Sequence, residues 1–205
     1  MQLKETVNRL LNPNNNDHII LLYDDDQSRD DAIAQYLNQG LKRNQLCIYA
    51  SINMREKEHM KRIADKIENY DENVATGNLL IIDLAPFYIA ALCDDLTPFE
   101  NARKVFVDKV KDRADKYIRF VGDGTGFLFK NKHFEECLAV EGWWQQKPFV
   151  GSCMCPFSKS LFEAYPYSNY QRSLLTTKHD VAIDTEGRVV STFNATTNRN
   201  GGGNS

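Results

Sequence analysis

Hydrophobic and polar positions along the chain form two kinds of pattern that follow one another. Short runs that are apolar throughout, beginning with His18–Tyr23, are typical of strands covered on both faces. Between them lie stretches in which apolar residues recur every three or four positions, which indicates amphipathic helices. We predict strands over 18–23, 46–52, 79–84, 117–121 and 149–155, separated by helices over 28–41, 55–70, 97–116 and 132–146.

The two ends of the chain complete this pattern. The spacing predicts a short helix over 3–11, a further helix over 170–177 and a closing hairpin over 181–190. Strands that alternate strictly with helices imply an α/β fold, a mostly parallel sheet with helices on both faces. We divide the chain into an N-terminal helix and linker (1–17), one folded domain (18–193) and a tail (194–205) that we expect to be disordered.

Composition narrows the possible functions. The 205 residues carry 25 Lys and Arg against 28 Asp and Glu, a net charge of −3. A slightly acidic chain of this kind argues against direct binding of nucleic acid or of a membrane surface through overall charge. No run approaches the roughly 18 apolar residues of a membrane span, and the first residues lack a secretory signal. We therefore expect a cytoplasmic protein whose five cysteines stay reduced.

The loops that follow the strands are where an open α/β sheet usually binds ligands. After the first strand come Asp24, Asp25, Asp26, Asp30 and Asp31, at the place where a phosphate-binding loop needs glycines and a lysine. These carboxylates would repel a triphosphate. We interpret them as a solvated turn and as charges that complement the dipole of the following helix, since the spacing of a calcium loop is missing.

Two further strand exits leave alternatives open. Gly122–Gly126 is either a structural turn or the backbone wall of a ligand pocket. Asp83 ends an apolar strand, as the metal-holding acid of phosphate-loop ATPases does, but without such a loop it more simply fixes its own turn. The aromatic residues that crowd the segment from Trp143 to Tyr170 supply core, or line an apolar ligand cavity.

The cysteines offer a weak metal signal. Cys153 and Cys155 lie two residues apart, so that in a strand both side chains point to the same face. Zinc sites generally use pairs separated by two to four residues, with a second pair downstream. We therefore interpret Cys153 and Cys155 as packing residues and expect neither a metal nor a cofactor. A pairing of Cys155 with a distant histidine stays open.

Several short segments, taken in their order and spacing, resemble the MEDS family, the methanogen/methylotroph sensory domain known from a regulator of dichloromethane metabolism. The resemblance covers about residues 18–190. It is carried by His18–Tyr23, Gln39–Leu41, Cys47–Tyr49, Arg119, Gly122, Glu141, Cys155–Phe157 and His179. Phe157 stands where the family pattern leads us to expect Tyr, which removes a hydroxyl group.

The resemblance implies a degenerate RecA/KaiC-like fold and a cytoplasmic sensory domain that binds a small ligand, such as a hydrocarbon derivative, without catalysis. It also implies a partner, a histidine kinase or a transcription regulator. Its candidate ligand-binding residues are His18, Tyr23, Arg119, Glu141, Cys155 and His179.

The same residues have simpler interpretations. His18 could cap the start of its strand, Tyr23 could pack with its hydroxyl exposed, and Arg119 could form a buried ion pair with Glu141. The alternative function is a residual nucleotide-binding protein or ATPase that uses Asp83.

Overall fold

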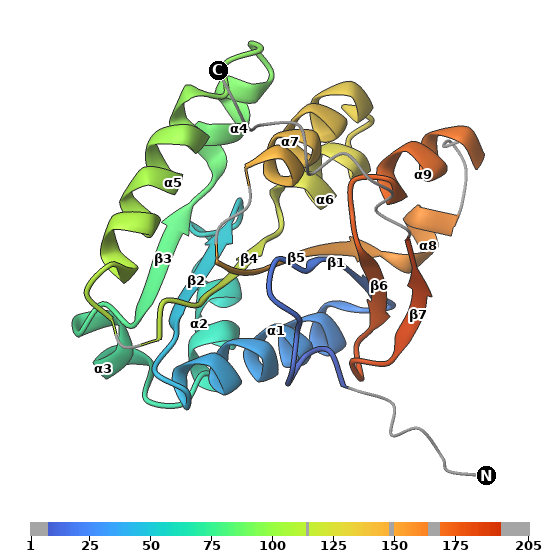
Figure 1. Ribbon diagram of the computed structural model, residues 1–205. Helices are drawn as coiled ribbons and strands as arrows, with labels where there is room; N and C mark the ends of the chain where they lie inside the picture. Colours follow the sequence, from blue (N-terminus) through green and yellow to red (C-terminus); the bar gives the residue numbers. More distant parts are fainter. Residues whose placement is uncertain (1–7, 114, 148–149, 164–168, 194–205) are drawn as a thin grey trace, which may run out of the picture.

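The computed structural model describes residues 8–113, 115–147, 150–163 and 169–193. Part of the predicted N-terminal helix and the whole of the predicted tail lie outside these residues. Within them, one sheet has the strand order β3-β2-β4-β5-β1-β6-β7 (Figure 1). Its strands are β1 (His18–Tyr23), β2 (Leu46–Ser51), β3 (Leu79–Asp83), β4 (Ile118–Gly122), β5 (Gly151–Ser158), β6 (Val181–Asp184) and β7 (Val189–Thr192).

The sheet confirms the expected α/β fold class, a mostly parallel sheet with helices on both faces and a C-terminal hairpin. Every neighbouring pair from β3 to β6 is parallel, and β7 alone runs antiparallel, paired with β6. The chain has to cross one face of the sheet between two parallel strands, and these crossover connections are mostly helical.

Helices cover both faces, which explains why the central strands are apolar throughout (Figure 1). One face packs on α1 (Asp26–Leu41), α2 (Lys57–Lys66) and α3 (Tyr70–Ala75). The opposite face, which we call the aromatic face, packs on α4 (Ala85–Ala91), α5 (Thr97–Val110), α6 (Gly124–Lys130), α7 (Phe134–Gln146) and α9 (Asn169–Thr176). A short helix, α8 (Lys159–Glu163), follows β5.

The structure corrects several predicted elements. The helix predicted over 55–70 is two helices, because the chain is extended at the buried Ile67 and turns left-handed at Asn69. Residues 8–11 of the predicted N-terminal helix form a turn, in which the Asn8 side chain accepts from the backbone N–H groups of Leu10 and Leu11. Helices α4, α6 and α8 were not predicted.

Strand β5 runs three residues further than predicted and includes Pro156. A proline lacks the N–H that a central strand donates on one side. The pairing of β4 with β5 ends at Val121 and Met154, so that β5 has only β1 beside it at Pro156. The missing donor is therefore tolerated there.

Glycines let α6 lie against β5. A Cβ atom built on Gly126 would lie 2.2 Å from the backbone oxygen of Pro156, which cannot move away as a flexible side chain could. A Cβ atom on Gly142 in α7 would meet nothing nearer than the Lys178 side chain at 3.8 Å. There is thus room for a methyl group at Gly142 but none at Gly126.

This difference gives a prediction for the free energy of unfolding. Gly126→Ala should destabilise the fold by about 1–3 kcal/mol, because the added methyl group forces α6 away from β5. Gly142→Ala should stabilise it by up to about 1 kcal/mol, since alanine is the better helix former. Urea denaturation of both variants beside the parent checks this, and equal effects would contradict the close approach of α6 to β5.

Candidate functional site

Four of the six residues that the sequence indicated lie together on the aromatic face. His18 begins β1, Cys155 lies in β5, Glu141 lies in α7, and His179 precedes β6. One donor atom from each residue lies within 4.8 Å of the others. All four are buried, Glu141 completely. We call these four residues the polar cluster.

Glu141 is the centre of the polar cluster. Its Oε2 lies 3.0 Å from His18 Nε2 and 3.4 Å from His179 Nε2. The sulfur of Cys155 lies 3.4 Å from His18 Nε2 and 3.7 Å from Glu141 Oε2. Cys153 lies at the edge of the cluster, and its sulfur is 3.9 Å from that of Cys155. The two side chains therefore point to the same face of β5, as predicted from the alternation of side chains along a strand.

Burial and the neighbouring charges shape the protonation of the cluster. Burial alone would raise the pKa of Glu141, but His179 and His18 lower it below its usual range. Burial opposes charge on His18 as well, yet Cys155 and Glu141 raise its pKa well above 6.5. Burial and the nearby His18 lower the pKa of His179. The cluster therefore carries a carboxylate beside one protonated and one neutral imidazole when protons alone occupy it.

Arg119 lies outside the polar cluster, so that the ion pair with Glu141 considered above does not form. Its guanidinium is buried on the other face of the sheet. It donates to the Gln45 side chain at 2.8 Å and to the backbone oxygens of Tyr36 at 3.0 Å, Leu10 at 2.9 Å and Leu11 at 3.0 Å. Arg119 thereby ties the N-terminal turn to β4 and α1.

Tyr23 also lies apart from the polar cluster, at the carboxyl end of β1. The guanidinium of Arg29 lies 5.4 Å from the centre of its ring. The same guanidinium pairs with Asp26 at 2.9 Å and with Asp30 at 2.7 Å. Arg29 therefore neutralises part of the charge of the aspartate run. Asp30 is fully buried, so that it is not the solvated residue that we expected.

The remaining residues at the strand exits fix loops. Asp25 accepts from the backbone N–H of Ser28 and caps α1, in agreement with the interpretation of the aspartates as helix-start charges. Asp83 accepts from the backbone N–H of Ala85 at 3.0 Å and from Arg55 at 3.0 Å. It lies on the edge strand β3, four strands away from β1 in the order of the sheet.

A half-buried acid, Asp123, follows β4. It accepts from the Ser51 hydroxyl and, at 2.9 Å, from the backbone N–H of Ile52. The Ser51 oxygen lies 3.4 Å from His59 Nε2, which also contacts the Tyr49 hydroxyl at 2.8 Å. Desolvation raises the pKa of Asp123 from 3.8 to about 6. Asp123 is the acid at a strand exit that the sequence analysis did not single out.

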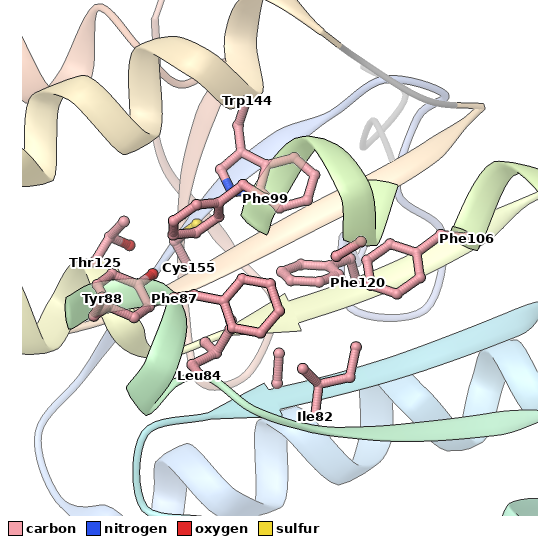
Figure 2. Close-up of a pocket in the computed structure, with 13 residues that line it drawn as sticks. Ile82, Leu84, Phe87, Tyr88, Phe99, Phe106, Phe120, Thr125, Trp144 and Cys155 are labelled. Carbon is pink, nitrogen blue, oxygen red and sulfur yellow. The ribbon is translucent and has the colours of Figure 1, made fainter. Parts of the chain in front are cut away.

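A cavity lies beside the polar cluster, between the aromatic face of the sheet and helices α4 and α5 (Figure 2). The space that the centre of a water molecule can reach inside it is about 20 Å³. Its aromatic walls come from Phe87, Tyr88, Phe99, Phe106, Phe120 and Trp144. Cys155 forms part of the wall, so that one side chain belongs both to the cavity and to the polar cluster.

Thr125 is the cavity residue that sequence reasoning missed. It lies in α6 and is 2 % exposed, and its hydroxyl oxygen has no hydrogen-bond partner within the described residues. Figure 2 shows it among the side chains that line the cavity. Gly122 is a lining residue too, so the segment Gly122–Gly126 serves both as a wall and, from Gly124, as the start of a helix. The proximity of Thr125 to two glycines is the signal that could have pointed to it.

Comparison with known proteins places the chain in a family. The sequence model of the MEDS family, the methanogen/methylotroph, DcmR sensory domain, matches residues 17–165. The chain belongs to this family, and its class is therefore that of a sensory domain. Three members of the polar cluster lie inside the match, and His179 lies beyond it. No curated protein matches the chain.

Among solved structures, the chain is similar to the flagellar accessory protein FlaH from Methanocaldococcus jannaschii. The identity is 12% and the TM-score 0.43, over 82% of this chain and 70% of that chain. Among the described residues, no helix has both the length and the apolar character that crossing a bilayer requires.

The raised pKa of Asp123 predicts a pH dependence of stability. The folded protein holds this proton more tightly than the unfolded chain, so that the contribution of Asp123 to stability falls as pH rises from about 4 to about 6. At 1.36 kcal/mol per pKa unit, the loss amounts to about 3 kcal/mol. Asp123→Asn removes this titration, and the variant should therefore gain stability relative to the parent over the same range.

Urea denaturation of the parent and the variant at several pH values measures this difference. Asp71→Asn, a change at an exposed position on α3, is the control and should follow the parent. A parent-to-variant difference that stays constant between about pH 4 and 7 would contradict the raised pKa of Asp123 in the folded protein.

Proposed function

We propose that the domain senses a small, mostly apolar organic molecule that binds in the aromatic cavity and hydrogen-bonds to Thr125. The unpartnered Thr125 hydroxyl carries this proposal. A buried hydroxyl without a partner costs free energy, and a ligand with one polar atom would supply the missing hydrogen bond. Ligand sites typically combine apolar walls with a few such polar groups. A small hydrocarbon derivative has this chemistry.

The size of the cavity limits the ligand. A cavity of about 20 Å³ holds one or two water molecules, since one water requires roughly 10–15 Å³ by the same measure. A molecule of about four non-hydrogen atoms therefore fits only when the side chains of the wall move outward, as the proposed displacement of α4 and α5 requires. At no more than about 1.5 kcal/mol per atom, its dissociation constant is no better than tens of micromolar.

The wall of the cavity offers a route for the signal. Helices α4 and α5 form its outer side, and they carry exposed apolar side chains, Ile89 at 65 % exposure and Val105 at 50 %. A ligand that favours one position of these helices shifts the population of the surface they present. In this proposal a partner protein, a histidine kinase or a transcription regulator, reads that surface, and the domain itself catalyses no reaction.

The test uses two probes of similar size, 1-propanol and dichloromethane. Both should raise the melting temperature of the protein and change the fluorescence of Trp144, which lies in the wall. Thr125→Val keeps the shape and removes the hydroxyl. It should weaken binding of 1-propanol about 3- to 10-fold, the value of one neutral hydrogen bond, and leave dichloromethane binding unchanged or improved.

A matched pair of variants locates the binding. Ala102→Phe fills the cavity and should abolish the response to both probes, whereas Ala75→Phe, at an exposed position of α3, should preserve it. Retained binding in Ala102→Phe, or no response of the parent at millimolar concentrations, would refute the proposal. Saturable binding of labelled ATP with magnesium would instead favour the nucleotide-binding alternative.

A further inference from the structure

The orientation of the two histidines in the polar cluster is fixed by the backbone. His18 Nδ1 lies 2.8 Å from the carbonyl oxygen of Lys178, and His179 Nδ1 lies 3.0 Å from that of Leu175. A carbonyl oxygen only accepts hydrogen bonds, so each Nδ1 carries a hydrogen. In the neutral form, each Nε2 then presents a lone pair. Both Nε2 atoms face the carboxylate of Glu141.

This arrangement is short of hydrogen-bond donors. Two lone pairs and a carboxylate converge, and a proton on His18 Nε2 satisfies only the 3.0 Å contact with Glu141. His179 Nε2 and Glu141 Oε1 are both buried without a hydrogen-bond partner among the described residues. Buried polar atoms are nearly always paired, so these two indicate that a cation belongs between the side chains.

The spacing of the donor atoms is close to that of a tetrahedral metal site. Bonds of about 2.0–2.3 Å in tetrahedral geometry place neighbouring ligand atoms roughly 3.3–3.6 Å apart. Four of the six separations among Glu141, His18, His179 and Cys155 run from 3.0 to 3.7 Å, and all six lie within 4.8 Å, so that an ion would draw the widest pair together. In each histidine the ring nitrogen away from the centre donates to a carbonyl, the outer contact that metal-binding histidines almost always make.

We propose that His18, Glu141, Cys155 and His179 together bind one zinc ion. Two imidazoles, a carboxylate and a thiolate are zinc ligands, whereas calcium and magnesium take oxygen ligands. The ion displaces two protons to solvent, one from the Cys155 thiol and one from His18 Nε2, and gives each Nε2 lone pair a partner. In this proposal Cys155 acts as a ligand in addition to packing in the core, with partners that come from distant parts of the chain.

A second hollow touches the cluster at His18. It has a volume of about 20 Å³, lies at the amino end of β1 and β5, and is lined in part by Asp17, His18 and Cys153. The zinc site does not depend on the proposed ligand, since the aromatic cavity shares only Cys155 with the four proposed metal ligands.

The test is metal binding by the intact chain. Protein purified without chelators, analysed by native mass spectrometry, should carry zinc at about one ion per chain. After the zinc is exchanged for Co²⁺, the protein should show the thiolate-to-cobalt charge-transfer absorption in the near ultraviolet. Cys155→Ser should lose that absorption and bind zinc at least 100-fold more weakly, because loss of a ligand exceeds the roughly 10–100-fold effect of losing an outer contact.

Cys153→Ser is the matched control. It changes the neighbouring thiol on the same face of β5 and should keep both the absorption and the affinity. Glu141→Gln, in which the amide is nearly the shape of the carboxylate, should keep the absorption while binding zinc more weakly, so that the proposal survives a failure of Cys155→Ser to fold. Circular dichroism confirms folding in each case.

Two results would overturn the proposal. One is folded parent protein that binds neither zinc nor cobalt after exposure to both ions. The other is a folded Cys155→Ser that retains the charge-transfer absorption. Neither measurement uses the cavity probes, so failure of the zinc site and failure of the ligand cavity are distinguishable.

Discussion

The parallel pairing of β1 with β5 is the constraint on which the rest of the site depends. In this register His18 lies opposite Cys153 and Ile20 lies opposite Cys155. Because side chains alternate along a strand, a shift of one residue would turn both cysteines to the opposite face, away from His18 and Glu141. Helix α7, which packs on this face of the sheet, completes the polar cluster with Glu141. Residues from the two ends of the domain thus meet because two central strands are neighbours.

The loop that follows β1 is held by side chains of the protein itself, not by a bound phosphate group. In a nucleotide-binding protein, backbone N–H groups at the start of a helix hold the phosphates. Here Asp25 accepts from the backbone N–H of Ser28 at the start of α1, and Arg29 is paired with Asp26 and Asp30. These two groups already have partners within the protein. The cavity and the polar cluster lie instead on the aromatic face.

The sequence predicted the parts of the fold that depend on local pattern. Apolar runs such as His18–Tyr23 gave the strands, and strict alternation gave the parallel sheet. The family resemblance supplied four residues that the structure brings together. It could not separate Arg119 from them, because a buried guanidinium held by backbone carbonyls has no signature in sequence. Helix α6 and Thr125 were missed for a related reason: Gly126 serves close packing against β5 and Gly124 serves close packing against Tyr88 of α4, whereas glycine spacing alone is typical of a turn.

Cys155 is the side chain that the cavity and the polar cluster share. Its sulfur faces Glu141 and His18, while part of the residue lines the aromatic cavity. A ligand in the cavity therefore lies in contact with a side chain that the cluster holds in place. If the cluster is rigid, occupation of the cavity has to be accommodated by its opposite wall, α4 and α5, where the exposed apolar side chains lie. A fixed inner wall and a movable outer wall are what a domain needs in order to convert the binding of a very small molecule into a change at its surface.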